Sequence, residues 1–336
     1  MAMPRTAGTR RAEGEDRPLF DREATPAAGM QRRSNAAGLS PRATRLRTAM
    51  STFETVVRRT IPRPLRNWLR APSRSLRVIG EEMAYRVGVC PRVVVREDWS
   101  FRCHPTVRRA LLQQLDDPAQ VTELDEFIRT CTPGMVLFDI GAHFGAFSLA
   151  AIRYGGAGVR VFAVEPSPFA VRLFRVQARL CGPFDGVTLL TAAAAAESGS
   201  HRMLPVGVVA FGYFVTPSDD RSDADLTTVE AVSIDSLAER YGVHPTHVKI
   251  DVEGFEASVL EGGVHVLSHP DGPSVFLELH CKILREHGVP PGLPLELLED
   301  YGYCDFREGG RPVSPEQVAQ SEAPLARIVA CKASEA

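Results

Sequence analysis

The segment VLFDIGAHFGAF, residues 136–147, combines an acidic residue, a histidine and two glycines directly after a run of apolar residues. Asp139 lies near the end of the apolar run, and Gly141 and Gly145 lie on either side of His143. Glycine permits tight turns and lets a ligand approach the backbone closely, and the N-terminus of a following helix favours negative charge. The segment therefore predicts a strand-to-helix turn that contacts a ligand at the end of a buried strand.

Glu165, in the segment FAVEP, follows this glycine turn by about 20 residues, which is the usual spacing for an acid that binds ribose hydroxyls. The turn and the acid together predict a nucleoside-containing cofactor, with an ordinary strand-to-helix turn of a Rossmann-like domain as the alternative. A dinucleotide site needs the pattern G-x-G-x-x-G, and its middle glycine is absent, since only His143 lies midway between Gly141 and Gly145. The turn suits a less demanding ligand, such as an adenosyl amino acid, whose amino or cationic group Asp139 would then meet.

Two further polar clusters follow apolar segments later in the chain. HVKIDVEGFE carries Lys249, Asp251 and Glu253 at alternate positions, and LELHCK carries Glu278 and His280. Buried parallel strands are normally continuous apolar runs, so charges at their ends are costly unless they are used or paired. We expect Asp251 to act in a site and Lys249 to pair with one of the acids. For Glu278 and His280, a site role and structural hydrogen bonding are both open.

Hydrophobic periodicity places these clusters on an alternating β/α pattern. Apolar segments of strand character are separated by stretches with helical spacing, and this alternation indicates an α/β fold with a mostly parallel sheet and helices on both faces. In such sheets ligands bind at the carboxyl ends of the strands, so the polar clusters should share one edge. The predicted strands are MVLFDIG, VRVFAVEP, GVTLLTAA, HVKIDVEG and PSVFLELH, and the predicted helices cover residues 145–154, 167–181 and 254–267.

Further elements are predicted around this pattern. PRVVVREDWSFRCHP alternates like a strand pair, and residues 106–116 and 119–131 have helical spacing. The stretch 201–237 predicts a β-ribbon insertion with a polar tip at 218–225. YGYCDFRE and LARIVACKA predict two closing edge strands near the C-terminus.

The N-terminal part differs in composition from the rest. Residues 1–50 are rich in Arg, Ala, Gly, Pro and Ser without an apolar period, which predicts a disordered tail. Residues 51–130 are expected to form an N-terminal extension or lid on a domain at 131–336. Within the extension, residues 51–80 are expected to be a loosely docked arm, since prolines interrupt their pattern. A short amphipathic helix at a membrane surface or partner is the alternative.

Composition limits the possible functions. The formal net charge is -2, so the overall charge does not attract the chain to nucleic acid or to an anionic membrane. The 7 cysteines lack metal-ligand spacing, and no run reaches the ~20 apolar residues that a membrane span needs. We therefore expect a cytoplasmic protein with reduced thiols.

Four segments lie in a fixed order between about residues 134 and 280: VLFDIGAHFGAFSL, VFAVEPSPFAVRLFRVQARL, AVSIDSLAERYG, and VKIDVEGFEASVLEGG followed by VFLELH. Together they resemble the FkbM-type methyltransferases, although that family usually has asparagine at the position of His143. Its members are class I enzymes that depend on S-adenosylmethionine, mostly O-methyltransferases. The resemblance implies a Rossmann-like fold with a seven-stranded, mostly parallel sheet, and S-adenosylmethionine as the cofactor.

The resemblance also implies, by position, which residues contact the cofactor. Those around the methionine part follow the first strand and are Asp139, Gly141, His143 and Gly145. Those at the ribose follow the second strand and are Glu165, Ser167 and Pro168. Those beside the adenine follow the third strand and are Ala193 and Ala194.

Methyl transfer from a sulfonium is an in-line displacement, so the acceptor oxygen, the methyl carbon and the sulfur must be aligned. A hydroxyl acceptor also needs a base within hydrogen-bond reach or a metal ion. Asp251 is the first candidate for the base, followed by Glu278 and His280, and the same residues could bind a divalent cation. The expected acceptor is a small molecule with a hydroxyl group, either a sugar or a natural product. It would enter between the strand ends, residues 81–130 and residues 201–228.

Two other classes of function are kept as alternatives. An oxidoreductase with an NAD-type cofactor would need the three spaced glycines that the turn lacks. A non-catalytic nucleotide- or nucleic-acid-binding protein would use the arginine-rich N-terminal arm, since arginine clusters attract phosphate. The predicted folded part has no basic surface with interleaved aromatic residues, so nucleic acid is not the expected partner.

Overall fold

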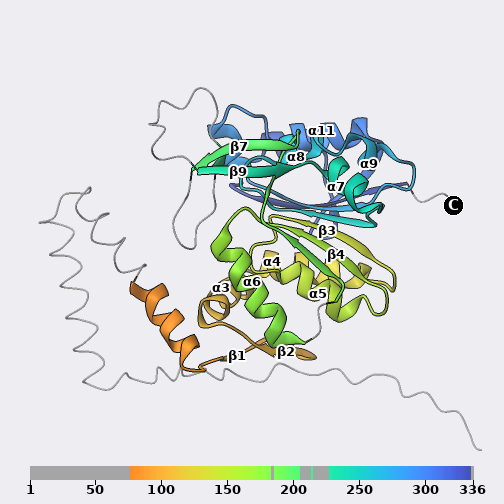
Figure 1. Cartoon of the computed structure of the whole chain (residues 1–336). Helices are drawn as coiled ribbons and strands as arrows, with labels where there is room; N and C mark the ends of the chain where they lie inside the picture. The colour runs from red at the N-terminus through yellow and green to blue at the C-terminus, as the bar shows by residue number, and fades with distance from the viewer. Residues whose placement is uncertain (1–75, 183–184, 205–212, 215–226, 334–336) are drawn as a thin grey trace, which may run out of the picture. The chain divides into compact units, whose positions relative to one another are not determined.

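The structure is a computed structural model that describes residues 76–182, 185–204, 213–214 and 227–333. These residues belong to one unit of the chain, Asn67–Ala336. The predicted N-terminal tail and most of the predicted arm lie outside the described residues. Figure 1 shows the described part as a central sheet with helices on both sides.

The central sheet has eight strands in the order β13-β12-β14-β11-β10-β3-β4-β5. Strands β3 and β10 pair in parallel at its centre, and their side chains are almost all buried because helices cover both faces. The parallel strands are β3 (Val136–Ile140), β4 (Arg160–Val164), β5 (Val187–Leu190), β10 (His247–Ile250) and β11 (Ser274–Leu279).

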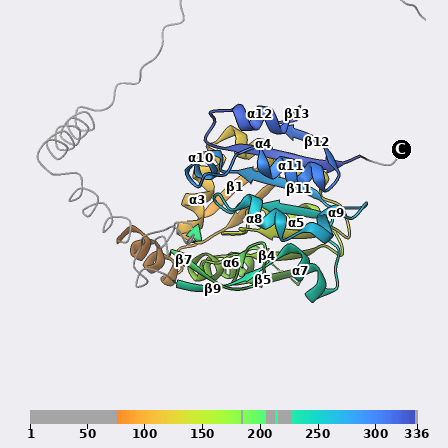
Figure 2. The same ribbon diagram turned by 90° about the horizontal axis from the view of Figure 1, so that it is seen from above.

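Three strands joined by antiparallel pairings complete the sheet on the side of β11. They are β12 (Tyr303–Glu308), which runs in the direction of β11, and β13 (Arg311–Pro312) and β14 (Ala326–Lys332), which run the opposite way. The predicted α/β fold with a mostly parallel sheet is confirmed, with one strand more than the seven expected, since β13 adds a two-residue strand. The prediction of two edge strands is wrong, because β14 pairs with β11 on one side and β12 on the other. The short β13 forms the edge beside β12. Figure 2 shows β12 and β13 at one edge of the sheet and β4 and β5 toward the other.

Helices pack on the two faces through separate apolar clusters. On one face lie α3 (Pro105–Leu115), α4 (Pro118–Thr130), α5 (Ala146–Tyr154) and α6 (Pro168–Cys181). On the other lie α7 (Ile234–Tyr241), α8 (Glu256–Glu261), α9 (Val264–Ser268) and α11 (Leu293–Asp300). Three helices near the C-terminus were not predicted: α10 (Cys281–Glu286), α11 and α12 (Pro315–Gln320).

Residues 254–267 form two helices, α8 and α9, where the sequence predicted one. Gly262 and Gly263 separate them. A Cβ at Gly262 would lie 2.4 Å from the carbonyl oxygen of Ala195, so a glycine is needed where the chain passes this backbone. The apolar spacing continues across the break, which is why the pattern predicted a single helix.

The elements before β3 follow the prediction closely. Strands β1 (Arg92–Arg96) and β2 (Trp99–Arg102) form the predicted antiparallel pair, and α3 and α4 begin and end within one residue of the expected bounds. Both helices have a proline in the first turn and a side chain that caps the N-terminus, His104 for α3 and Asp117 for α4. A further helix covers residues 76–86. The apolar sides of α3 and α4 share one core cluster with the sheet.

A separate four-stranded sheet, in the order β6-β9-β7-β8, corresponds to the predicted ribbon insertion. Its strands are β6 (Ala193–Ala194), β7 (Gly199–Leu204), β8 (Tyr213–Phe214) and β9 (Thr227–Val232). Strands β7 and β9 are antiparallel, as expected of a ribbon. The ribbon ends before Ser233, which caps α7 with a reciprocal hydrogen-bonded capping box, so the last predicted ribbon residues are helical. The predicted tip at 218–225 lies outside the described residues.

Two expectations from composition concern the whole chain. Within the described ranges, no helix has the length and apolar character required to cross a bilayer. All seven cysteines lie in the described part and are free thiols. Burial raises the pKa of the Cys103 thiol to about 12 and that of Cys131 to about 11, so these two remain protonated.

Replacing Gly145 by alanine should destabilise the fold, because a Cβ there would lie 2.5 Å from the Phe174 ring and the backbone φ is +81°. We expect a loss of about 3 kcal/mol in the free energy of unfolding, from steric overlap and left-handed strain together. Gly134→Ala is the matched control, since its φ is +78° and nothing lies within 4 Å. It should cost about 1 kcal/mol. Urea denaturation of both variants tests this, and equal losses would contradict the packing role of Gly145.

Candidate active site

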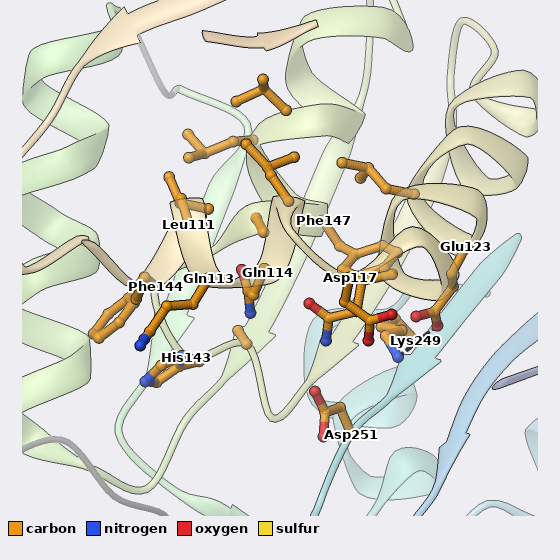
Figure 3. Close-up of a pocket in the computed structure, with 18 of the residues that line it drawn as sticks. Leu111, Gln113, Gln114, Asp117, Glu123, His143, Phe144, Phe147, Lys249 and Asp251 are labelled. Carbon is orange, nitrogen blue, oxygen red and sulfur yellow. Dashed lines mark ion pairs between the residues drawn. The ribbon is translucent and has the colours of Figure 1, made fainter. Parts of the chain in front are cut away.

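A cavity of about 420 Å³ lies at the carboxyl ends of β3 and β10, under the α3–α4 pair. Figure 3 shows Gln113, Gln114 and Asp117 on the α3–α4 side of this cavity, facing His143 and Asp251 on the sheet side. Its remaining lining includes apolar side chains of α3, α4 and α5 and of the loop between β3 and α5. The polar clusters predicted from sequence thus meet at one sheet edge.

Gly141 allows the turn after β3 to pass directly over the neighbouring strand end. Its φ is +81°, and a Cβ there would lie 1.8 Å from the carbonyl oxygen of Asp251. The Asp251 N–H donates to the Ile140 carbonyl at 3.0 Å, and the Gly141 N–H donates to that of Val164 at 2.9 Å. The requirement for glycine here therefore comes from protein backbone, whereas the sequence suggested a ligand. The same holds for Gly145, which makes room for the Phe174 ring.

Asp139 is buried and makes its hydrogen bonds to helix α5. Its carboxylate accepts from the Ser148 backbone N–H at 3.1 Å and from the Ser148 hydroxyl. Gly145 is the N-cap residue of α5 and has no side chain that could accept a hydrogen bond. Asp139 therefore supplies an acceptor for the free N–H groups at this helix end. Burial raises the pKa of Asp139, although the bonds from Ser148 and the charge of Lys249 oppose this. The predicted contact of Asp139 with the cofactor stays a prediction.

Glu165 joins the loop after β4 to the loop after β3. Its carboxylate accepts from the His143 N–H at 2.9 Å and from the Ser167 N–H at 2.8 Å. The side chain is 7% exposed, and burial raises the pKa of Glu165 to about 7 despite these two bonds. The two elements expected to hold an adenosyl cofactor therefore contact each other directly.

His143 has a left-handed backbone with φ of 49°, a conformation in which histidine and asparagine are both enriched. Its ring lies 3.6 Å from the ring of Phe144, centroid to centroid. Burial lowers the pKa of His143 to about 4, so the ring is neutral at physiological pH. His143 lines the cavity.

The other predicted cofactor residues have structural contacts. Ser167 caps α6 by accepting from the Ala170 N–H at 3.3 Å, and Pro168 is the first residue of that helix. Ala193 and Ala194 are buried in β6, where they pair with β9. None of these four lines the cavity described above, and their contacts with a cofactor stay predictions.

Asp251, Glu253 and His280 converge at the ends of β10 and β11. His280 Nε2 lies 3.4 Å from a Glu253 oxygen and 3.9 Å from an Asp251 oxygen. Its other nitrogen, Nδ1, lies 2.8 Å from Glu256, whose side chain is fully buried. Burial favours a lower pKa for His280, but the bond to Glu256 and the nearby carboxylates raise it to about 9. Burial and the Glu278 carboxylate raise the pKa of Asp251 well above its usual range.

Glu278 belongs to a second buried cluster, around Lys249. Lys249 Nζ lies 2.8 Å from Glu123 and 3.6 Å from Glu278, which confirms the predicted pairing of Lys249 with an acid. Arg327 contacts Glu278 at 3.2 Å and Glu123 at 3.4 Å. Burial alone would lower the pKa of Lys249, but the surrounding carboxylates raise it, so the ammonium stays charged. Glu278 is thus engaged by two cations, and its charge also raises the pKa of Asp251.

Sequence reasoning missed four of these residues: Glu123, Glu253 as a site residue, Glu256 and Arg327. Glu123 is an acidic residue on the buried side of α4, and an acid at an apolar helix position was the available signal. The sequence indicated Glu253 only as the last of three charged residues at alternate positions. Arg327 carried no signal, because β14 reaches its place beside β11 from far along the chain.

Comparison with known proteins agrees with this geometry. Residues 139–303 match the family model described as the methyltransferase FkbM domain. The described sheet is mostly parallel, with β14 inserted antiparallel between β11 and β12. The chain therefore carries a methyltransferase domain of class I. More specifically, residues 139–303 form an FkbM methyltransferase domain.

Similar solved structures include methyltransferase FkbM from Methylobacillus flagellatus KT, with 16% identity, a TM-score of 0.37, and coverage of 67% of this chain and 54% of that one. This chain thus spans about half of that protein. Precorrin-6y C5,15-methyltransferase from Geobacter metallireducens GS-15 has 17% identity, a TM-score of 0.37, and coverages of 64% and 87%. Aeropyrum pernix fibrillarin, solved with natively bound S-adenosyl-L-methionine, has 12% identity, a TM-score of 0.33, and coverages of 60% and 68%. A search of curated proteins finds no match.

Glu123→Gln should destabilise the protein, because it removes a charge next to the buried Lys249 and Arg327 while keeping the side-chain shape. We expect a loss of about 3 kcal/mol in the free energy of unfolding. Glu126→Gln is the control on the same helix, since Glu126 is only partly buried and has no ion pair within the described part of the chain. It should change stability by under about 0.5 kcal/mol. If chemical denaturation gives similar values for both variants, Glu123 does not hold α4 to the sheet.

Proposed function

We propose that this protein transfers a methyl group from S-adenosylmethionine to a hydroxyl of a small-molecule acceptor, a sugar or a natural product. The observation that carries the proposal is the meeting of three elements at one sheet edge. The turn after β3 and Asp251 both line the cavity, and Glu165 is hydrogen-bonded to that turn. The FkbM methyltransferase domain at residues 139–303 supports the reaction class, and this geometry suggests where the reaction takes place.

The cofactor would lie across the turn after β3, with its ribose toward Glu165. Each carboxylate oxygen of Glu165 accepts one backbone N–H, and a carboxylate oxygen can accept a second hydrogen bond. Ribose hydroxyls are donors that suit this remaining capacity. The sulfonium end would then extend along His143, a neutral side chain, into the cavity where Asp251 lies.

Asp251 is positioned to take the proton from the acceptor hydroxyl. As the hydroxyl oxygen attacks the methyl carbon, the bond from carbon to sulfur breaks, the sulfur keeps its electron pair as a neutral thioether, and the proton passes to Asp251. A carboxylate of raised pKa is a stronger base than an ordinary one, and burial raises the pKa of Asp251. The α3–α4 pair above the cavity would exclude water during transfer.

The lining of the cavity supports an acceptor with both hydroxyl groups and apolar surface. The α3–α4 side of the cavity carries amide and carboxylate groups that can pair with hydroxyls. They belong to Gln113, Gln114 and Asp117. Leu111 and Phe147 supply apolar surface in the same cavity.

No comparable feature favours an NAD-type oxidoreductase, since the turn that would contact a pyrophosphate carries His143. The free cysteines support placing the protein in the reducing cytoplasm.

Binding of S-adenosylhomocysteine should strengthen as the pH rises from about 6 to about 8. Free Glu165 has a pKa of about 7, and ribose hydroxyls favour its ionised form, so binding releases a proton in this range. The nearest titratable neighbours are His143, which is neutral throughout, and Asp139. Glu165→Gln should bind several-fold more weakly with a flat pH profile. Calorimetry at several pH values tests this, with NAD as the comparison ligand, and an unchanged profile in the variant would remove Glu165 from the site.

Asp251→Asn should lower methyl transfer by about a hundredfold or more while leaving S-adenosylhomocysteine affinity within about twofold. Transfer is measured as release of S-adenosylhomocysteine with a hydroxyl acceptor that the unaltered protein methylates, chosen from a panel of sugars and hydroxylated natural products. Asp271→Asn, at an exposed position, is the control and should transfer normally. Full turnover in Asp251→Asn would exclude that residue from the chemistry.

A further inference from the structure

We propose that Asp251, Glu253 and His280 together bind a divalent cation, of the Mn²⁺ and Mg²⁺ class, at the sheet side of the cavity. The use of this cation in methyl transfer rests on the proposed function above. Binding of the cation does not depend on that function, because the ligands are inferred from the geometry of these side chains alone.

The distances between the candidate ligand atoms fit one ion. Within the described part of the chain, one oxygen each of Asp251 and Glu253 and one ring nitrogen of His280 lie within 4.8 Å of one another. The His280 nitrogen is 3.4 Å from the Glu253 oxygen and 3.9 Å from the Asp251 oxygen. An octahedral ion with bonds of about 2.2 Å separates neighbouring ligands by roughly 3 Å and opposite ones by roughly 4.4 Å. Small side-chain adjustments therefore suffice to close the site.

Glu256 orients His280 in the manner of a histidine that binds metal. His280 Nδ1 lies 2.8 Å from Glu256 Oε1, which also accepts the Gly254 N–H at 2.9 Å. With an ion bound, this partner would keep the proton on Nδ1, and the ion would displace the proton from Nε2, which lies toward the Asp251 and Glu253 oxygens. Metal-binding histidines commonly donate their other N–H to a carboxylate in this way.

The burial of Glu256 gives this cluster an excess of carboxylates, since a charged His280 offsets only one of them. Its side chain is fully buried, and its Oε2 oxygen has no hydrogen-bond partner among the residues that the structure describes. A buried carboxylate with an unpartnered oxygen is costly unless a cation lies nearby. Lys249 does not fill this role, because its contacts are to Glu123 and Glu278. Three carboxylates thus surround one imidazole.

The donor types select the class of ion. Two carboxylates are hard oxygen ligands that suit Mg²⁺ and Mn²⁺, and an imidazole shifts the preference toward Mn²⁺. Asp251 and Glu253 both line the cavity, so an ion they hold has access to an acceptor hydroxyl and would lower its pKa. Asp251 would hold the ion through one carboxylate oxygen and accept the hydroxyl proton on the other.

The test is titration of the full-length, chelator-treated protein with MnCl₂, with free Mn²⁺ followed by its electron paramagnetic resonance signal. We expect one saturable site per chain. Glu253→Gln and His280→Gln should each weaken binding by at least about tenfold, and Glu256→Gln by about tenfold through loss of the orienting contact. Glu286→Gln is the control, since Glu286 is 62% exposed and pairs only with Lys282 within the described residues. It should bind Mn²⁺ normally.

Absence of saturable binding, or equal binding by the Glu253→Gln and His280→Gln variants, would overturn the site. Circular dichroism and urea denaturation show that each variant is folded before it is compared. The outcome is separate from that of the proposed function, because Mn²⁺ binding is measured without cofactor or acceptor. Methyl transfer that proceeds fully in excess chelator would overturn the catalytic use of the ion, whereas lack of S-adenosylhomocysteine binding would count against the proposed function.

Discussion

The site depends on the close approach of two strand ends, where Gly141 lies against the Asp251 carbonyl with no space for a Cβ. This contact, together with the Asp251 N–H bond to Ile140, fixes the turn after β3 directly beside the carboxylates after β10. The Val164 carbonyl and Glu165 hold the same turn from the other side. A ligand lying on the turn is therefore brought within reach of Asp251 by backbone geometry, before any side chain moves.

The charges near this contact are divided between two clusters with different roles. Lys249, Glu123, Glu278 and Arg327 pair with one another, so they compensate their own burial and tie α4 and β14 to the centre of the sheet. The Asp251 cluster has an excess of carboxylates over cations and lies at the cavity. An unbalanced cluster facing a cavity is the arrangement that favours chemistry or ion binding, whereas a balanced one favours stability.

The sequence was informative where short-range patterns determine structure. Strands β3, β4, β10 and β11, helices α3 to α6, and the convergence of their polar ends were predictable, because apolar periodicity and parallel topology set them. The sequence could not reveal partners brought together by long-range pairing, such as Arg327 on β14 with Glu123 on α4. It also suggested a ligand as the reason for Gly141 and Gly145, since a contact with Asp251 or Phe174 leaves no trace in the local pattern.

A crystal structure of the protein with S-adenosylhomocysteine would test the central claim most directly. The account predicts that the ribose hydroxyls lie within hydrogen-bond distance of Glu165, that the Gly141 contact with the Asp251 carbonyl is retained, and that the sulfur faces the Asp251 carboxylate across the cavity. A ligand bound away from Glu165, or a turn displaced from the end of β10, would contradict it.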